Sequence, residues 1–534
     1  MTPAVTKRTS RTGDSTPVAE KADNFDDTWI VKERSIDESR PLRVVIIGAG
    51  ISGIMACVRF VQRIPNLQLC IYEKNADIGG TWFENRYPGC ACDIPAHTYQ
   101  ATFEPNKEWS QFYASAPEIH RYWKRVAFKY GCLKYMKLKQ KVSEAIWDDE
   151  QSKWCLKVQD VDSGTIYSDK CDLLIQATGA LNDWKWPKIP GLHDFKGELM
   201  HSATWDESYD YKALSFSPEE LESFKKDHQV YQNFRKEVEL QLQSVHGSTL
   251  TGSEMQIDGQ QAFAENMKAR LANKPELFDE LVPSFPPACR RLTPGPGYLE
   301  ALTDPKVNLI KSDIVKVDET GIVTADGQHR PVDMLVCATG FDTSSTPRFP
   351  IIGSGGMPLS EKWKDTPENY MSVTTDGFPN FFICLGPNSG LGEGNLLLLI
   401  EKSIDYFTEC IQKMQRDNIR AMTVRRDAVR RFTKYCDQYF SLTVFSSKCR
   451  SWYKGGTEDG RIVALWPGSS LHARKAFANP RWEDFEYEYV DDNPAGWLGD
   501  GWTENEKYNR INVDYLDDDQ IDFPLPASDF TLSV

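Results

Sequence analysis

The chain has 534 residues, of which 40% are hydrophobic and 26% are charged, as expected for a globular protein of two or three domains. Its net charge of −15 argues against nucleic acid or an anionic membrane as a partner, because both need a basic surface. The longest apolar runs, such as residues 396–400, are far too short to cross a membrane. The sequence therefore predicts a cytoplasmic protein without a transmembrane segment.

The cysteines and histidines carry no metal signature. The 13 Cys and eight His residues show no C-x-x-C or C-x-x-H spacing, so no metal site is predicted. The odd number of Cys and the lack of an apolar signal segment favour a reducing compartment. The first 40 residues are polar and mix both charge signs, and they are expected to form a disordered tail.

A strand, a glycine-rich turn and a helix open the ordered part of the chain. Residues 44–47 are β-branched, and apolar residues recur at helical spacing up to residue 64. A second strand is expected over residues 67–72, and Glu73 follows it. The turn has the pattern G-x-G-x-x-G and consists of Gly48, Ala49, Gly50, Ile51, Ser52 and Gly53.

This order of elements predicts a Rossmann-type βαβ unit that binds a dinucleotide. Gly48 permits the tight turn, Gly50 lets the backbone approach a pyrophosphate, and Gly53 lets the helix pack on the strand. The free N–H groups at the helix N-terminus face the phosphates. Glu73 is placed to accept hydrogen bonds from a ribose 2′-OH and would repel a 2′-phosphate, which favours FAD or NAD over NADP. The alternative is a glycine-rich turn without a ligand.

Further elements are expected along the rest of the chain. Ser217-Pro218-Glu219-Glu220 forms a capping box with Pro at the first helical position, and it opens a polar helical segment over about residues 217–275. A hairpin is expected around residues 162–164, between strands at 157–160 and 165–167. The other predicted strands are residues 172–177, 307–314, 321–324 and 333–337.

Several motifs resemble those of class B flavin monooxygenases, and the resemblance extends over roughly residues 40–500. Residues 195–206 fit the pattern F-x-G-x-x-x-H-x-x-x-W-[PD], which marks the Baeyer–Villiger subgroup. The stretches 386–389 and 450–453 are similar to those of fungal members, which often belong to secondary-metabolite pathways. The loop expected near the flavin contains Gly79-Gly80-Thr81-Trp82, Asn85-Arg86-Tyr87-Pro88-Gly89 and Asp93.

The resemblance implies a chemistry. In this family FAD is reduced by NADPH and reacts with O2 to form a peroxyflavin, which attacks a ketone and gives an ester or lactone. The chain is therefore expected to be an FAD-dependent monooxygenase that inserts oxygen next to a carbonyl. The expected substrate is a small ketone or aldehyde of polyketide or terpenoid type. The sequence does not indicate an oligomeric state.

The resemblance also implies roles for individual residues. Arg291 matches the arginine that stabilises the peroxide, and Asp93 matches the carboxylate that orients it. From local sequence alone, Arg290 and Arg291 would be a solvated basic pair and Asp93 a turn residue. The residues expected to bind FAD are Gly48, Gly50, Ile51, Ser52, Gly53, Glu73, Gly80, Thr81, Trp82, Phe83, Glu84, Ala91, Cys92, Asp93, Ile94 and Tyr99.

Three of the motif residues are expected to be structural. Cys92 in the flavin loop is interpreted as a small buried hydrophobe rather than a redox group. His201 is expected to be a structural hydrogen-bonding residue, since a lone His is more often structural than catalytic. By resemblance, His201 and Trp205 would take part in a hinge between domains.

The chain departs from the family in one respect. A second G-x-G-x-x-G for NADPH should follow at about residue 212, and it is absent; residues 247–252 cannot replace it because no apolar strand precedes them. NADPH use is therefore left open. The alternatives are an oxidase or non-redox flavoprotein that does not use NADPH, an inactive FAD-binding homologue, or the product of an incomplete gene model.

The predicted fold is α/β. A Rossmann-type FAD-binding domain would be built from residues 41–180 and 346–490. A truncated second nucleotide-binding domain would span residues 181–345 and contain the helical insertion. Residues 491–534 would form a C-terminal extension.

Overall fold

The computed structural model describes residues 31–521, apart from residues 182, 205–215, 294, 296, 492 and 494. The chain divides into two compact units, of which the larger comprises residues 37–490. Most of the predicted N-terminal tail, residues 1–30, lies outside the described residues, as do Trp205 and Asp206. None of the described helices is long and apolar enough to cross a membrane.

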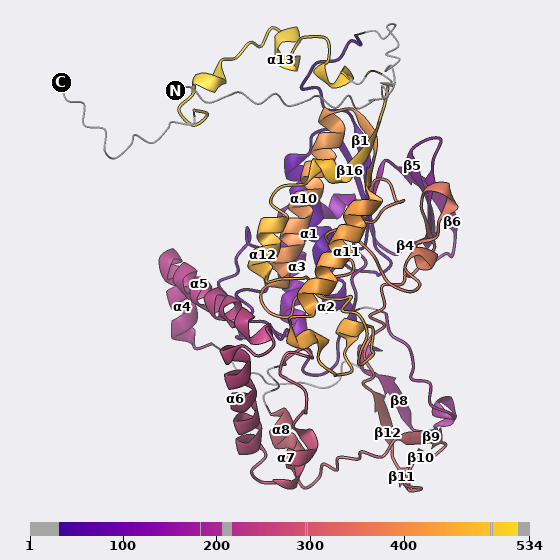
Figure 1. The fold of residues 1–534 in the computed structure, drawn as a ribbon, viewed down its shortest axis with the longest axis vertical. Coiled ribbons are helices and arrows are strands. Elements are labelled where there is room, and N and C mark those ends of the chain that lie inside the picture. Colours follow the sequence, from indigo (N-terminus) through magenta and orange to yellow (C-terminus); the bar gives the residue numbers. More distant parts are fainter. Residues whose placement is uncertain are drawn as a thin grey trace, which may run out of the picture. The chain divides into compact units, whose positions relative to one another are not determined.

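A parallel five-stranded sheet forms the centre of the larger unit, in the order β14-β7-β1-β2-β3. Its middle strand, β1, is labelled in Figure 1. The predicted strands at 44–47, 67–72 and 172–177 are present as β1, β2 and β7, and β1 pairs with β2 in register from Leu42↔Leu67 to Ile47↔Tyr72. The five strands are β1 (Leu42–Ile47), β2 (Leu67–Tyr72), β3 (Met136–Lys137), β7 (Leu173–Gln176) and β14 (Phe381–Ile383).

Alternate residues of β1 face two different layers, because successive side chains of a strand point to opposite faces. Val44 and Ile46 pack with the helices α1 (Ile51–Arg63), α3 (Ala116–Lys129) and α10 (Leu396–Arg416). Val45 and Ile47 pack against the antiparallel sheet on the other side. Burial on both faces explains why β1 is an unbroken apolar run rather than an alternating one.

The antiparallel layer contains the predicted hairpin. β5 (Lys153–Asp160) and β6 (Ile166–Cys171) flank the turn at residues 161–165, and β4 (Gln140–Asp148) pairs with β5. β13 (Ile351–Ile352) adds to the edge of β4, so the C-terminal half of the chain contributes to this layer as β14 does to the central sheet.

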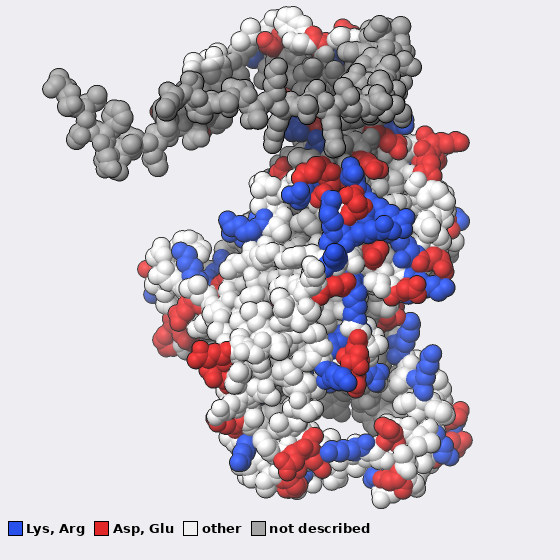
Figure 2. All heavy atoms as spheres, in the orientation of Figure 1, with Lys and Arg blue, Asp and Glu red and all other residues white. Residues whose placement is uncertain are grey.

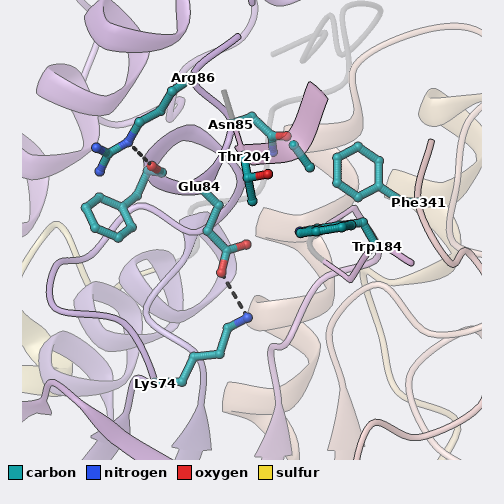
Figure 3. Close-up of a pocket in the computed structure, with 9 residues that line it drawn as sticks. Lys74, Glu84, Asn85, Arg86, Trp184, Thr204 and Phe341 are labelled. Carbon is teal, nitrogen blue, oxygen red and sulfur yellow. Dashed lines mark hydrogen bonds and ion pairs between the residues drawn. The ribbon is translucent and has the colours of Figure 1, made fainter. Parts of the chain in front are cut away.

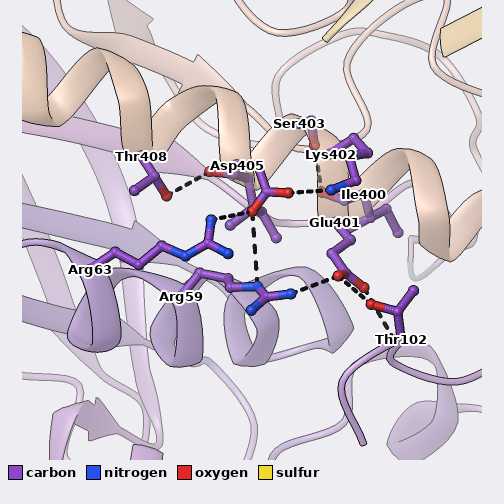
Figure 4. Close-up of polar contacts among 10 residues, drawn as sticks. Arg59, Arg63, Thr102, Ile400, Glu401, Lys402, Ser403, Asp405 and Thr408 are labelled. Atoms are coloured by element: carbon purple, nitrogen blue, oxygen red, sulfur yellow. Dashed lines mark hydrogen bonds and ion pairs between the residues drawn. The ribbon is translucent and has the colours of Figure 1, made fainter. Parts of the chain in front are cut away.

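Ion pairs join the helical layer across a long sequence distance (Figure 4). Arg59 of α1 donates to Glu401 of α10 at 2.7 Å, and Arg63 donates to Asp405 at 2.8 Å. Glu401 is 2% exposed and also accepts hydrogen bonds from the hydroxyl and backbone N–H of Thr102. The carboxylate is therefore fully paired, as a buried charge requires.

A second group of strands follows in the region where a truncated nucleotide-binding domain is predicted. β8 (Glu198–His201) pairs in parallel with β12 (Met334–Cys337), and no third strand joins them among the described residues. β9 (Ile314–Asp318), β10 (Gly321–Thr324) and β11 (His329–Pro331) form an antiparallel sheet. The predicted strand at 307–314 is wrong except for its last residue, because β10 pairs with residues 314–318 and the apolar side chains at 309 and 310 stay exposed.

The polar segment after residue 216 is helical, as predicted. Ser217 and Glu220 make both hydrogen bonds of a capping box at α4, with Pro218 in the first turn, and the Asp227 carboxylate caps α5. The helices from here to residue 302 are α4 (Pro218–Lys226), α5 (His228–Ser244), α6 (Glu254–Arg270), α7 (Glu276–Leu281) and α8 (Tyr298–Leu302).

The remaining regular elements complete the two units. In the larger unit these are α2 (Thr81–Glu84), α9 (Leu359–Lys362), β15 (Ile419–Val424), α11 (Arg426–Phe440), α12 (Ser470–Ala476) and β16 (Phe485–Tyr489). The smaller unit contains α13 (Glu504–Lys507). Figure 2 shows Lys and Arg side chains gathered over α11 with acidic side chains among them. Arg431 of α11 pairs with the buried Asp484 at 2.6 Å.

Candidate active site

The turn between β1 and α1 is closed so tightly that two of its glycines have no room for a side chain. A Cβ on Gly48, where φ is +108°, would lie 2.5 Å from the carbonyl oxygen of Ala177. A Cβ on Gly53 would lie 2.1 Å from the carbonyl oxygen of Gly48. No side chain caps the N-terminus of α1. The helix therefore presents free backbone N–H groups and its positive dipole end, which together suit a phosphate.

A second glycine turn faces the first. The backbone N–H of Gly79 donates to the carbonyl oxygen of Ala49 at 3.0 Å, and a Cβ on Gly80 would lie 3.0 Å from the Cα of Gly50. Gly79 and Gly80 both have positive φ, at +117° and +54°. The two backbones can thus approach each other only because both positions lack side chains.

Glu73 lies beside the glycine turn and is only 4% exposed. Its carboxylate accepts a hydrogen bond from the backbone N–H of Ala49 at 2.8 Å and another from Asn75 at 2.9 Å. Burial raises the pKa of Glu73, and the two backbone hydrogen bonds oppose that shift. The carboxylate is therefore fixed where β2 ends, with lone pairs left for a further donor.

The loop after the second glycine turn supplies aromatic and small buried side chains. Trp82 is 9% exposed, and its indole N–H donates to the Tyr99 hydroxyl at 3.3 Å while the rings meet edge to face at 5.6 Å. Cys92 is a buried free thiol whose pKa is raised by burial, which agrees with a packing role. Ile51, Thr81 and Ile94 are half-buried, Ser52 is buried and Ala91 is exposed.

A cavity of 280 Å³ opens next to α2 (Figure 3). Asn85 is 4% exposed, and its side-chain carbonyl oxygen is buried without a hydrogen-bond partner among the described residues. One carboxylate oxygen of Glu84 is likewise unpartnered, while the other pairs with Lys74 at 2.9 Å. Trp184 and Phe341 line the other side in Figure 3. The cavity thus offers hydrogen-bond acceptors opposite flat apolar rings. Its lining is Lys74, Phe83, Glu84, Asn85, Arg86, Trp184, Ala203, Thr204 and Phe341.

Arg291 and Asp93, which are 198 positions apart in sequence, meet in a two-point ion pair. The Nε and Nη2 groups of Arg291 donate to the two carboxylate oxygens of Asp93 at 2.5 and 2.9 Å. These hydrogen bonds raise the pKa of Arg291 and fix the plane of the guanidinium. Arg290 instead donates to the backbone carbonyl of Arg450 at 2.6 Å. The two arginines are therefore not an equivalent solvated pair.

Comparisons with known proteins show the family of the chain. Residues 46–116 match the NAD(P)-binding Rossmann-like domain. The chain is 34% identical to the FAD-binding monooxygenase moxY of Dothistroma septosporum, over 87% of this chain and 83% of that protein. It is 31% identical to a Baeyer–Villiger monooxygenase of Pseudomonas aeruginosa, over 82% and 89%. The chain belongs to this family of FAD-binding monooxygenases. The predicted family, cofactor class and enzyme class are confirmed.

Solved structures show the same fold. The closed crystal structure of cyclohexanone monooxygenase has a TM-score of 0.73 and 24% identity, and covers 85% of this chain and 100% of its own. A steroid monooxygenase bound to NADP has a TM-score of 0.70 over 84% of this chain. The predicted α/β class with a Rossmann-type domain is therefore confirmed.

No G-x-G-x-x-G motif follows β8 in the sequence of the monooxygenase, and residues 205–215 lie outside the described part of the chain. His201 ends this strand and accepts a hydrogen bond from the backbone N–H of Ala203 at 3.1 Å. Its ring stacks on Trp184 at 4.3 Å, and its other nitrogen lies 3.2 Å from the Thr339 hydroxyl. Burial lowers the pKa of His201, so the ring is neutral at neutral pH. These contacts agree with a structural role. The segment at 245–249 is a short 3₁₀ helix with no strand before it.

Two features of the monooxygenase were not predicted from sequence. A disulfide joins Cys289 to Cys449, which are 160 residues apart, although the odd number of Cys had favoured reduced thiols. Tyr453 packs near Arg291, and the two groups influence each other's titration. No local pattern could have shown either contact, because both join loops that meet only in the folded chain.

Proposed function

We propose that FAD lies across the two glycine turns of this monooxygenase. The free N-terminus of α1 would bind the pyrophosphate through the backbone at Gly50, Ser52 and Gly53, and Glu73 would accept from the ribose. Two observations support this fit. The buried side-chain oxygen of Asn85 lacks a hydrogen-bond partner among the described residues, and the close approach of Gly80 to Gly50 leaves backbone without side chains for a ligand to contact. Trp82 and Tyr99 would line the flavin ring.

We propose further that the enzyme inserts an oxygen atom next to the carbonyl group of a ketone or aldehyde, in a reaction of the Baeyer–Villiger type. FAD, when bound and reduced, would supply the two electrons that activate O2, of which one oxygen atom would be inserted and the other released as water. A neutral carbonyl compound must then meet a negatively charged oxygen away from bulk water. Trp82, Tyr99 and Cys92 would keep water away through their buried contacts.

Arg291 would stabilise the negative charge that develops during the reaction. The single observation that carries this role is its two-point pairing with Asp93. The pairing holds the cation in one orientation, and a guanidinium keeps its charge at any working pH. A cation that is already oriented does not have to reorganise as charge develops, which is the main advantage of a preorganised site.

The substrate class is proposed from relatives and not from the cavity. The relatives include FAD-binding monooxygenases of Dothistroma septosporum and Aspergillus terreus, whose names suggest biosynthetic gene clusters. A ketone or aldehyde of polyketide or terpenoid type in secondary metabolism is consistent with that group. O2 would be the second substrate.

An experiment on Arg291→Ala tests the proposed function. The purified protein is mixed anaerobically with NADPH, or with dithionite where NADPH fails, while the flavin absorbance is followed, and a ketone and O2 are then added. We expect the flavin of Arg291→Ala to be reduced normally but to yield H2O2 instead of ester. Arg420→Ala, which removes an exposed arginine that pairs with Glu488 at 3.3 Å, is the matched control. Ester formation by Arg291→Ala at the wild-type level would overturn the proposal.

The second candidate function is an oxidase or another flavoprotein that does not use NADPH. The second nucleotide-binding motif is missing from the sequence after β8, and among the described residues β8 pairs only with β12, which supports this candidate. In that case NADPH would leave the flavin oxidised, and a candidate substrate alone would bleach it. A flavin reduced by neither would indicate an FAD-binding homologue without this activity.

The division into domains is also a proposal. Residues 41–180 and 346–490 would form the FAD-binding domain, because β13 and β14 join sheets whose other strands come from the first segment. Residues 181–345 would form the truncated second domain, and residues 491–534 the C-terminal extension. Limited proteolysis followed by mass spectrometry tests these boundaries.

A further inference from the structure

The loop that carries Arg291 is fastened to residues 449–453 at neighbouring positions. Cys289 is joined to Cys449 by the disulfide. Arg290 donates to the backbone carbonyl of Arg450 at 2.6 Å. One position further along, Arg291 lies beside the phenol of Tyr453. The two segments therefore run together up to the guanidinium that is proposed to act on the reacting oxygen.

Tyr453 is almost completely enclosed, with 1% of its surface exposed. It lies in a short 3₁₀ helix (Trp452–Lys454), where its backbone N–H donates to the Ser451 hydroxyl. Its ring packs edge to face against Phe445 at 5.9 Å. The ring contacts would be equally good for phenylalanine, so they do not explain the hydroxyl group.

The hydroxyl of Tyr453 is buried, and among the described residues no group meets it with good hydrogen-bond geometry, although Arg291 lies near enough to act on it as a donor. A buried polar group without a partner is unfavourable, so such a group calls for an explanation. Burial raises the pKa of Tyr453 to about 12, and the charge of Arg291 opposes that shift. The phenol is therefore neutral at working pH, and its oxygen lies where it is influenced by the cation.

Asp93 leaves part of the Arg291 guanidinium without a partner. The carboxylate accepts one N–H from Nε and one from Nη2, so its two hydrogen bonds leave Nη1 unused. A guanidinium has five N–H donors, so a small rotation could bring one of the remaining three toward the phenol oxygen.

We propose that Tyr453 is a positioning residue for Arg291. Its phenol oxygen supports the guanidinium as a second acceptor beside Asp93, and the disulfide and the Arg290–Arg450 contact hold the two loops in the register that this support needs. The inference rests on the proposed function, because it gives Tyr453 a role only through Arg291.

The test compares Tyr453→Phe with Tyr406→Phe. The hydroxyl of Tyr406, in α10, is also buried without a partner, so the control removes an equivalent group. The readout is the ratio of oxygenated product to H2O2 after the bound flavin is reduced and mixed with O2 and a ketone. We expect Tyr453→Phe to lower this ratio about tenfold, as for loss of a hydrogen bond to a charged group, and Tyr406→Phe to leave it unchanged. FAD content and melting temperature should stay at the wild-type level in both variants.

A double variant separates positioning from mere packing. In an Arg291→Lys background, Tyr453→Phe should cause little further loss, because effects that act through one group are not additive. An equal fold-loss in both backgrounds, an unchanged ratio in the single variant, or loss of FAD by Tyr453→Phe alone would each overturn the inference. If Arg291→Ala abolishes oxygenation while Tyr453→Phe does not lower the ratio, only the role of Tyr453 fails. If Arg291→Ala is harmless, the proposed function fails.

Discussion

Replacing Asp93 by Asn should reduce oxygenation about tenfold without changing the charge state of Arg291. Asn has the shape of Asp, but only one of its two polar atoms can accept a hydrogen bond. One of the two short contacts to the guanidinium, at 2.5 and 2.9 Å, is therefore lost, and an amide N–H group faces another donor. Arg291 keeps its charge because its intrinsic pKa is far above working pH.

The magnitude follows from the exposure of the pair. A hydrogen bond to a charged group contributes about 1.5–3 kcal/mol. The side chains of Arg291 and Asp93 are 37% and 29% exposed, so solvent screens their interaction and the lower end of that range applies. A loss of about 1.4 kcal/mol in the oriented state corresponds to a factor of about ten.

The assay measures the ratio of oxygenated product to H2O2 between pH 6 and 9. The tenfold loss should be the same throughout this interval, because the guanidinium does not titrate there. Asp326→Asn is the matched control, because Asp326 also pairs with an arginine, Arg330 at 2.9 Å, and the pair is exposed to a similar degree but belongs to the separate β9–β10–β11 sheet. A ratio within twofold of wild type, or a loss that disappears at one end of the pH range, would refute the reasoning.

Three other changes test the fold and the cofactor site. Gly53→Ala should destabilise the protein by more than about 2 kcal/mol and abolish FAD binding, because its Cβ would lie 2.1 Å from the carbonyl oxygen of Gly48; chemical unfolding and flavin absorbance measure both. Arg59→Ala should lower the free energy of unfolding by about 3 kcal/mol, because Glu401 would keep a buried charge without its cation. Glu73→Gln should weaken FAD binding about tenfold by titration calorimetry. Burial raises the pKa of Glu73 in the folded, FAD-free protein above its value in the unfolded chain. The contribution of Glu73 to stability is therefore fully present below the pKa of the unfolded chain and is lost as the pH rises through the pKa of the folded protein. Glu73→Gln should remove this pH dependence from melting curves measured at several pH values.

Local sequence patterns were sufficient for the elements whose contacts are short in sequence. The β1–α1–β2 unit was predictable because its turn, helix and strands lie within about thirty residues. Gly48 and Gly53 are required there because a side chain would clash with the neighbouring backbone. The capping box at Ser217 and the hairpin around residues 162–164 were predictable for the same reason. The strand predicted at 307–314 was wrong because its apolar residues are typical of a strand but find no partner strand. Residues 314–318 pair with β10 instead.

The sequence by itself determined that this chain has a dinucleotide turn with an acidic strand end, and that the second turn is missing. Only the tertiary structure decided which side chains stand together at the site. Arg291 and Asp93 are 198 residues apart, and Cys289 and Cys449 are 160 apart. Such contacts form only when whole layers of the fold pack together and bring distant loops into contact. Local sequence preferences cannot predict which loops will meet. The position of Tyr453 beside Arg291 follows from the same packing, and it is the contact that a sequence pattern was least able to reveal.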